Sequence, residues 1–587
     1  MTVLDTATVN GEDGSDSGAN STGQTAVGVQ DASNVSKSKG VSRRQLMFGA
    51  GGAAAAFGLL PAWSRPPELA SGYVFHDRSG TGQRRFSDPG IAGVLVSNGR
   101  DVVRTDEDGR WQLALRDGDS AFVIKPSGWS TPLGRGGVPS FSYLHQPNGS
   151  PADLKLQYPG VAPTGPIPRG IDFPLQPASE SDSFEALMIA DPQPQSGREL
   201  NYFSSDLAAT AIDTKAAFAI VHGDVTFDDL TLYPRYLDII GAMGLTWHHC
   251  PGNHDMNAEA AETRFAFETW KQTFGPCHYA FQHARATFIV LNNVSRTRGG
   301  ERDYGAEISP DQLTFVRNVL AHVPRDQLVV LSMHIPLMSR PDVADPVPHV
   351  TGAETLMGLL SPYPHTVSFS GHTHTAEHHY LGVEQGFLST EKHHHNVLAT
   401  ASGCWWGGPL DHRNVPLADC QDGSPRGHHV LEVEGNRYST RFVAASRPAD
   451  TAPMRVSIVT PGIAAGEPVP QHRLAASRLM ANVFDGGPRT QVSYEIGRVS
   501  GGPRPMQHVS ATDPAFCDMQ ARAPDAFKPW VKPINSSHLW SAPLPTDLAP
   551  GAYRLSVKLI DEYGRKRSVS SLLEVGAASE ELHAALR

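Results

Sequence analysis

The sequence predicts a central α/β domain flanked by two smaller all-β domains. From Phe184 to about Ala445, short apolar runs alternate with longer amphipathic stretches, which is the pattern of strands and helices in an α/β fold. Before Ser130 and after Arg455, the chain has short runs with alternating apolar positions and turn residues at intervals of about ten positions, which is typical of small β-sandwiches. A chain of 587 residues has room for roughly two to four domains.

The predicted boundaries follow these changes of pattern. Residues 1–40 are rich in Ser, Gly, Asn and Thr, which favours disorder because such a segment has little apolar surface to bury. A Pro/Gly-rich stretch between the first two folded regions predicts a linker. The expected organisation is a leader over 1–40, an export signal over 41–64, an N-terminal β-sandwich over 68–158, a linker over 159–182, the α/β domain over 183–447 and a C-terminal β-sandwich over 452–577.

An export signal is indicated near the start of the chain. Residues 42–47 read Ser-Arg-Arg-Gln-Leu-Met, a twin-arginine pattern, and a Gly/Ala-rich apolar stretch follows over 48–60. That stretch is too short and too weakly apolar to form a stable transmembrane helix. Ala62-Trp63-Ser64 offers small residues for cleavage by a signal peptidase. We therefore expect a periplasmic or secreted protein that is exported folded by the twin-arginine machinery. The alternative is a chance Arg-Arg pair before a buried helix.

Charge and cysteine usage narrow the function classes. The net charge of −11 argues against a nucleic-acid partner, because such proteins normally carry a basic surface. The five cysteines show no Cys-x-x-Cys spacing, so a Cys-based zinc module is not expected. Cys404 and Cys420 flank a Gly/Pro-rich loop, and their pairing as a disulfide is left open. The histidine clusters at 378–379, 393–395 and 428–429 are expected to be solvated loops.

Polar residues follow five predicted strands, and these residues are candidate metal ligands. The strands are predicted over 186–190, 218–221, 246–250, 328–332 and 366–370. Open α/β folds place their chemistry at the carboxyl ends of strands. The polar groups are Asp191-Pro192-Gln193, His222-Gly223-Asp224 followed by Asp228, Asn253-His254-Asp255, Met333-His334 and Gly371-His372-Thr373-His374. Carboxylates, amides and imidazoles in this number suit two metal ions, with one carboxylate able to bridge them.

This series resembles the calcineurin-like metallophosphoesterases, whose motifs run Asp-x-His, Gly-Asp, Gly-Asn-His-Asp/Glu, a lone His and Gly-His-x-His. The resemblance covers about 184–445, and the flanking β regions look like accessory domains beside this domain in some bacterial members. It implies a four-layer α/β/β/α sandwich with a dinuclear metal site. By this resemblance one metal is held by Asp191, Gln193, Asp224 and His374, and the other by Asp224, Asn253, His334 and His372. His254 is the implied acid or transition-state stabiliser, oriented by Asp228.

Gln193 departs from the commonest family pattern, which has His at this position. A Gln oxygen can still ligate a metal, but it is a harder donor than imidazole. We therefore expect two divalent ions, with manganese or iron favoured and zinc as the alternative.

The expected function is an exported phosphoesterase that hydrolyses a phosphomonoester or phosphodiester through a metal-activated hydroxide. The expected substrate is a small phosphorylated compound, with lipid-, sugar- and cell-wall-linked compounds left open. Trp405 and Trp406 in a Gly-rich loop are candidates to stack on substrate, and a core role for at least one is the alternative. Arg426 is a candidate phosphate contact, or part of a surface turn. A non-catalytic envelope binding protein that retains the metal site is the competing function.

Overall fold

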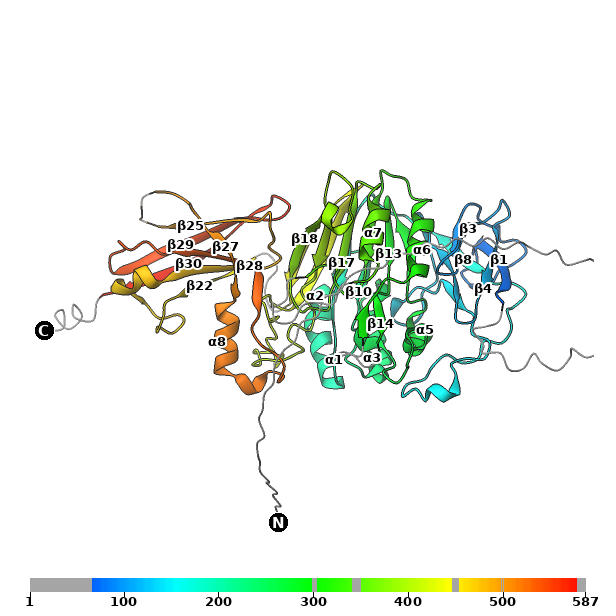
Figure 1. The fold of residues 1–587 in the computed structure, drawn as a ribbon, viewed down its shortest axis with the longest axis horizontal. Coiled ribbons are helices and arrows are strands. Elements are labelled where there is room, and N and C mark those ends of the chain that lie inside the picture. Colours follow the sequence, from blue (N-terminus) through cyan, green and yellow to red (C-terminus); the bar gives the residue numbers. More distant parts are fainter. Residues whose placement is uncertain are drawn as a thin grey trace, which may run out of the picture. The chain divides into compact units, whose positions relative to one another are not determined.

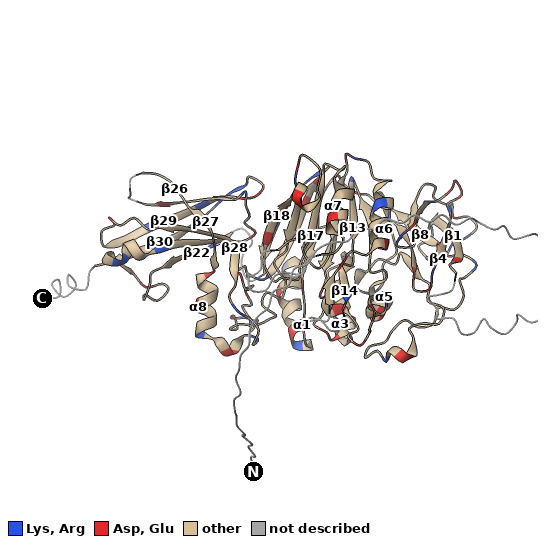
Figure 2. Cartoon of the chain, in the orientation of Figure 1, with Lys and Arg blue, Asp and Glu red and all other residues tan. Residues whose placement is uncertain are grey.

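The computed structural model describes residues 66–297, 304–339, 350–445, 453–497, 499 and 501–577. The predicted leader and twin-arginine signal lie outside these residues. Figure 1 shows an α/β region, drawn mainly in green, and two β-rich regions that precede and follow it in the chain. Basic and acidic residues are interspersed over the helices and strands (Figure 2). Within the described part of the chain, no helix has the length and apolar character needed to cross a membrane.

Two mixed sheets form the centre of the α/β region. The five-stranded sheet has the order β11(Thr246–Cys250), β10(Phe218–His222), β9(Ser183–Ile189), β20(Gly427–Glu434) and β21(Arg437–Ala444). The six-stranded sheet has the order β12(Tyr279–His283), β13(Ala286–Val290), β16(Leu328–Ser332), β17(Thr366–Ser370), β19(His393–Val397) and β18(Glu377–Leu381). Strands β9 to β11 are parallel to one another, as are β13, β16, β17 and β19, whereas β20 runs antiparallel to β9.

The two sheets pack face to face between layers of helices. Phe218 of β10 meets Phe288 of β13 edge-on, with ring centroids 5.1 Å apart. Residues of β10, β13 and β16 are buried along their whole length, because both faces of each sheet are covered. The helices between the strands of these sheets are α1(Gly197–Phe203), α2(Ala209–Ala211), α3(Tyr233–Gly241), α4(Thr263–Ala266), α5(Glu268–Phe274), α6(Pro310–Leu320) and α7(Ala353–Leu360). The result is the expected α/β/β/α order of layers.

The N-terminal region forms two four-stranded sheets. One has the order β4(Arg110–Leu115), β1(Glu68–His76), β8(Phe173–Pro177), β6(Trp129–Ser130), and the other β3(Val102–Arg104), β2(Leu95–Ser97), β5(Ser120–Ile124), β7(Ser142–Leu144). Strand β8 lies in the segment predicted as a linker, so this segment is part of the domain. It pairs in parallel with β1, and Phe173 stacks on Trp111 in the core. The apolar core continues into the α/β region, where Phe122 meets Phe315 of α6 at 5.8 Å.

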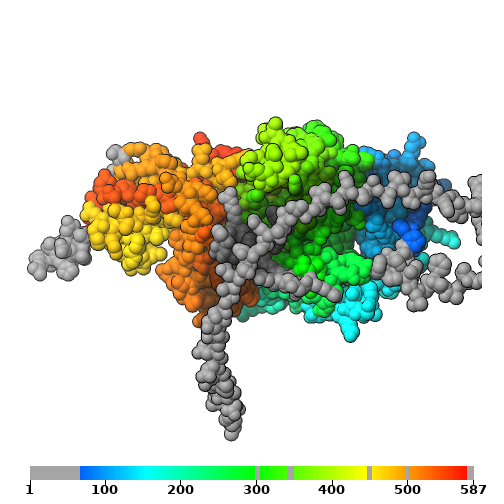
Figure 3. Space-filling model, in the orientation of Figure 1, coloured from blue at the N-terminus to red at the C-terminus, as the bar shows by residue number. Residues whose placement is uncertain are grey.

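The C-terminal region has its own apolar core between two sheets. Their orders are β22(Met454–Val459), β24(Arg478–Val483), β28(Asn535–Pro543), β27(Gln507–Thr512) and β23(Val469–Pro470), β30(Lys566–Gly576), β29(Gly551–Ile560), β25(Gln491–Ile496), β26(Arg504–Pro505). Helix α8(Pro514–Arg522) and the following residues leave the sandwich before β28. Figure 3 shows the atoms of this region in yellow, orange and red.

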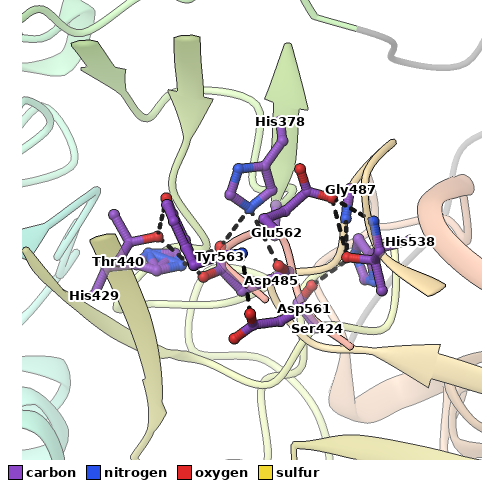
Figure 4. A network of polar contacts seen from close by, with 12 residues as sticks. His378, Ser424, His429, Thr440, Asp485, Gly487, His538, Asp561, Glu562 and Tyr563 are labelled. Carbon is purple, nitrogen blue, oxygen red and sulfur yellow. Dashed lines mark hydrogen bonds and ion pairs between the residues drawn. The ribbon is translucent and has the colours of Figure 1, made fainter. Parts of the chain in front are cut away.

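A buried polar network joins the C-terminal domain to the α/β domain (Figure 4). Asp485 Oδ1 lies 2.9 Å from His378 Nε2 of β18 and 3.3 Å from His429 Nε2 of β20. Asp422, in the loop before β20, accepts a hydrogen bond at 2.9 Å from Nε2 of His538 on β28. Because breaking a buried ion pair is costly, these contacts hold the C-terminal domain against the strands of the α/β domain.

The prediction that the histidine clusters are solvated loops is wrong. Residues 378–379, 393–395 and 428–429 lie in β18, β19 and β20 and are buried. Polar side chains on β17 satisfy the rings of His393 and His395, which makes their burial possible, whereas neither ring nitrogen of His429 has a hydrogen-bond partner among the described residues. Ser368 Oγ of β17, for example, lies 2.8 Å from His393 Nε2 and 2.7 Å from His395 Nδ1.

Candidate metal centre

All of the predicted metal ligands lie just beyond the carboxyl ends of strands in the two sheets, and the structure brings them together. The five-stranded sheet contributes four of them: Asp191 and Gln193 after β9, Asp224 after β10 and Asn253 after β11. The six-stranded sheet contributes the other three: His334 after β16, and His372 and His374 after β17. The parallel direction of these strands explains the meeting, because their carboxyl ends share one edge of each sheet.

His334 lies at the centre of one group of donor atoms. Its Nδ1 donates to the carbonyl oxygen of His222 at 2.8 Å, so in the neutral ring Nε2 carries a lone pair. That Nε2 lies 2.9 Å from Asn253 Oδ1, 3.3 Å from Asp224 Oδ1 and 3.2 Å from His372 Nδ1. Ligand atoms of Asp224, His334 and His372 all fall within 4.8 Å of one another. Four electron-rich atoms that face each other in the interior fit a cation.

The electrostatics of this group point the same way. Burial alone would lower the pKa of the His334 imidazole, but the carboxylate of Asp224, with a smaller contribution from Asp191, raises this pKa to about 9. Burial would raise the pKa of Asp224, yet the nearby imidazole of His334 holds it well below its ordinary value. The site therefore favours a positive charge beside Asp224, which a protonated ring or a metal ion provides.

A second group of donor atoms comes from Asp191, Gln193, Asp224 and His374. The hydrogen bonds of Gln193 test whether a metal ion fits this group. Its side-chain Nε2 donates to Asp224 Oδ2 at 3.0 Å, whereas its buried Oε1 has no hydrogen-bond partner. A buried acceptor without a partner costs free energy, and a bound cation would satisfy it. The orphaned oxygen therefore fits the expectation that Gln193 is a metal ligand in place of the commoner His.

Asp191 and His374 complete this second group. His374 Nδ1 is held by the carbonyl oxygen of Gly403, which leaves Nε2 free to ligate at 3.9 Å from Asp191 Oδ1. Asp191 also accepts hydrogen bonds from the backbone N–H of His372. Burial, together with the neighbouring charge of Asp224, raises the pKa of Asp191 to about 8. A divalent ion would offset this repulsion between buried carboxylates.

Several candidate ligands have a strained, left-handed backbone conformation, which directs their side chains toward the same place. Left-handed φ values occur at Asp191 (47°), Gln193 (45°), Asp224 (49°), Asp228 (62°), His372 (73°) and His374 (54°). Non-glycine residues adopt this region at a cost, and such residues cluster at functional sites. Close approach also demands glycine between them: a Cβ at Gly252 would lie 2.2 Å from Asp224 Oδ1, and one at Gly371 would lie 2.1 Å from Asp191 Oδ2.

Comparison with known proteins agrees with this geometry. Family models match three successive parts of the chain: the N terminal of calcineurin-like phosphoesterase over 78–158, calcineurin-like phosphoesterase over 187–376 and the C terminal of calcineurin-like phosphoesterase over 394–566. The chain belongs to the calcineurin-like phosphoesterases. It is therefore a phosphoester hydrolase that uses divalent metal ions, as the sequence predicts.

Among solved structures, a purple acid phosphatase from yellow lupin (Lupinus luteus) seeds is similar, with a TM-score of 0.34 and 13% identity over 65% of this chain and 72% of that chain. No curated protein matches the chain.

His254 of this phosphoesterase lies beside the ligand groups and is held from three sides. Its Nδ1 lies 2.8 Å from Asp228 Oδ1, and its backbone N–H donates to Asp224 Oδ1 at 2.9 Å. Its ring stacks on Phe227 with centroids 4.1 Å apart and an interplanar angle of 22°. Burial would lower the pKa of this imidazole, but the carboxylates of Asp224 and Asp228 raise it above the ordinary value. Asp255 points inward and accepts from Tyr233 Oη and the Gly252 N–H, so it braces the turn.

The two tryptophans of the Gly-rich loop have different surroundings. Trp405 is partly exposed, and its ring stacks on His374 with centroids 4.0 Å apart. Trp406 is buried, and its Nε1 donates to the carbonyl oxygen of Pro192 at 2.8 Å. In the phosphoesterase, Trp406 thus fixes the loop that carries Gln193, whereas Trp405 borders the candidate metal ligands.

The structure places Arg426 away from solvent, unlike either expectation from the sequence. Its side chain is fully buried, and its Nε lies 2.5 Å from Asp206 Oδ2 in the segment between α1 and α2. Its Nη1 donates to the carbonyl oxygen of Leu417. This guanidinium is committed to interior partners, so it stabilises the fold.

Cys404 and Cys420 do not form the disulfide that the sequence left open. Cys404 and Cys420 are both buried as free thiols, and burial raises the pKa of Cys404 to about 12.

Sequence reasoning missed three aromatic residues near the ligands. Phe227 stacks on His254, Tyr304 Oη lies 3.4 Å from His372 Nε2, and Trp530 of the C-terminal domain lies over Phe227 at 6.1 Å. None of the three belongs to a motif. A tryptophan within the polar stretch after α8 was the only signal for Trp530, and it does not indicate which surface the residue meets.

Proposed function

We propose that this phosphoesterase hydrolyses a phosphomonoester or a phosphodiester at a centre of two divalent ions. The observation that carries the proposal is the position of Asp224 between the two ligand groups. Its Oδ2 faces Gln193, which belongs with Asp191 and His374, and its Oδ1 faces His334. A carboxylate with each oxygen directed at a different set of donors is suited to bridge two ions.

The remaining chemistry follows from the residues around the substrate position. When bound, two divalent ions lower the pKa of water and offset the charge of the phosphate oxygens. Asp228 accepts the Nδ1 proton of His254, which directs the Nε2–H of the charged ring outward. Despite burial, the carboxylates of Asp224 and Asp228 raise the pKa of His254, which favours the charged ring, and this ring can donate its Nε2 proton to the leaving ester oxygen. Stacking on Phe227 keeps the ring plane fixed during the transfer.

The nature of the ions and the location of the enzyme are part of the proposal. The oxygen of Gln193 in place of an imidazole supports manganese or iron over zinc. The twin-arginine pattern at 42–47 supports export to the periplasm or medium, where the substrate would be a small phosphorylated compound. Retention of a chain with Arg43→Lys and Arg44→Lys in the cytoplasmic fraction, with export of the unaltered chain, would test this route. Equal export of both chains would refute it.

Hydrolysis of p-nitrophenyl phosphate and bis-p-nitrophenyl phosphate tests the catalytic proposal. The purified protein is assayed with manganese, iron(II), zinc or a chelator, beside Asp224→Asn and His254→Ala. His472→Ala, which changes an exposed histidine of the C-terminal domain, is the matched control. We expect metal-dependent turnover in the unaltered protein and in the control, with losses of about 100-fold or more in the two site variants. Stoichiometric metal binding without turnover of either ester would instead favour the binding-protein function.

A further inference from the structure

Three aromatic side chains form a continuous rim beside the ligand groups, which we call the aromatic rim: Phe227, Trp405 and Trp530. Phe227 stacks on His254, and Trp405 stacks on His374. Trp530 joins them, since its ring lies 6.1 Å from Phe227 at 22° and 6.1 Å from Trp405 at 79°. The rim therefore connects the implied acid with a metal-binding histidine through contacts between rings.

Trp530 is the member of the rim with the most open surface. Its side chain is 47% exposed, whereas Phe227 and Trp405 are partly covered by the imidazoles on which they stack. A large aromatic ring that stays exposed beside the candidate metal ligands offers apolar area that a ligand can bury. Trp530 lies between α8 and β28, so the C-terminal domain supplies it to the site of the α/β domain.

The segment that carries Trp530 is held in place before any ligand arrives. The Gly408 N–H donates to the carbonyl oxygen of Ala526 at 2.8 Å, and the Lys532 N–H donates to Gln421 Oε1 at 3.0 Å. Phe527 packs in a small apolar cluster with Cys404. Fixing a ring in its binding position in advance reduces the entropy that binding must overcome.

Two lysines flank Trp530, each two residues away along the chain. Lys532 is exposed, whereas Lys528 is paired, because its Nζ lies 2.8 Å from Gln195 Oε1 and 3.2 Å from Glu199 Oε1. This ammonium is thus committed to the loop after Gln193, which it ties to the C-terminal segment. The ring face of Trp530 remains for apolar, planar groups, on which stacking is favourable and tolerant of the chemical details of the partner.

We propose that the aromatic rim binds a planar ring in the alcohol part of the substrate, and that Trp530 sets a preference for phosphate esters of ring-bearing alcohols. This inference rests on the proposed function, because the phosphate must lie at the ligand groups while the ring lies on Trp530. Aryl-alkyl esters and nucleotides share this chemistry.

Matched ester pairs test the preference. Benzyl phosphate is compared with cyclohexylmethyl phosphate, and adenosine 5′-phosphate with ribose 5-phosphate, each as the monoester and as its methyl diester. The members of each pair have leaving alcohols of similar reactivity but differ in the planar ring. Values of kcat and KM are measured with the metal-loaded protein, with Trp530→Ala and Trp530→Phe, and with Leu572→Ala as a control at an exposed apolar residue on β30.

We expect kcat/KM to be roughly 5- to 10-fold higher for the planar member of at least one pair, mainly through KM. Trp530→Ala should abolish the difference, whereas Trp530→Phe and Leu572→Ala should retain it. The pair that shows the preference distinguishes aryl from nucleoside substrates. Equal kcat/KM within both pairs, or a preference that survives in Trp530→Ala, would overturn the inference and leave the proposed function standing. Failure to hydrolyse any of the esters would overturn the proposed function and this inference with it.

Discussion

Replacement of Arg426 by Met tests whether this residue stabilises the fold or contacts substrate. Arg426 and Asp206 are both fully buried and lie 2.5 Å apart, so removing the guanidinium leaves a buried carboxylate. Breaking a buried pair in this way costs about 3–5 kcal/mol. Asp206 keeps one cation, Arg413, at 2.6 Å, and that side chain is 32% exposed. We therefore expect a loss of stability near the lower end, about 3 kcal/mol.

The assay is thermal unfolding followed by tryptophan fluorescence, together with the kinetics of p-nitrophenyl phosphate hydrolysis. A loss of this size should lower the midpoint by roughly 6–12 °C for a cooperative unit of about 250 residues. At a temperature where the variant is folded, KM should be unchanged. The double variant Arg426→Met with Asp206→Leu should recover part of the stability, because both charges of the buried pair are removed and Arg413 keeps Asp411 as its partner. A raised KM with an unchanged midpoint would refute the structural role and restore the substrate contact expected from the sequence.

Three further predictions concern the site and the joint between domains. Gln193→Leu should weaken metal binding by at least about tenfold, measured as bound metal per chain after dialysis against buffered metal, because it removes the orphaned oxygen. Asp228→Asn should lower the pKa of His254 and move the alkaline limb of the kcat profile to lower pH, because the ring loses the charge that holds its proton. Asp485→Asn should lower the thermal midpoint most between about pH 4 and 6.5. In this range His378 and Asp485 are both charged in the folded chain, so their attraction contributes fully to stability.

The sign of the last effect follows from the two pKa shifts. Despite burial, Asp485 raises the pKa of His378, so this contribution is complete below the ordinary value of 6.5 and is lost as the pH rises through the folded value. Despite burial, His378 lowers the pKa of Asp485, so that contribution is present above 3.8 and is lost as the pH falls through the folded value. A penalty in Asp485→Asn that grows steadily above pH 7 would contradict this reasoning. Unchanged metal content in Gln193→Leu, or an unchanged pH profile in Asp228→Asn, would contradict the other two.

The sequence predicted β10 and β16 because these strands are almost wholly apolar on both faces. The bounds predicted for β11, β16 and β17 agree with the structure residue for residue. The ligands follow these strands directly, so their convergence could be inferred from strand order and the family motifs alone. Local sequence was a sufficient guide wherever the burial of a segment is evident in its own composition.

The rest depended on partners distant in the chain. Strand β19 reads His-His-His-Asn-Val and is buried only because Thr366 and Ser368 on β17 meet its rings. Arg426 is buried because Asp206, more than two hundred residues away, offers a carboxylate. Trp530 reaches the site because the C-terminal domain folds back to the loop at Gly408. In each case, the position of a polar or exposed residue depends on a contact with a distant part of the chain. The hydrophobic periodicity of the sequence does not reveal such contacts.

The position of β20 next to β9 has a consequence for synthesis on the ribosome. Every candidate metal ligand, from Asp191 to His374, is translated before β20 begins at Gly427. Pairing of Met188 with His429 joins residues about 240 positions apart, so at ordinary elongation rates β9 waits roughly 10–50 s for its neighbour. During that interval the nascent chain carries all the ligands of the centre but exposes a bare, apolar strand edge, the kind of surface that chaperones cover and that aggregation exploits. Slow translation before Gly427 would therefore lower the yield of folded enzyme, with no change in the enzyme itself.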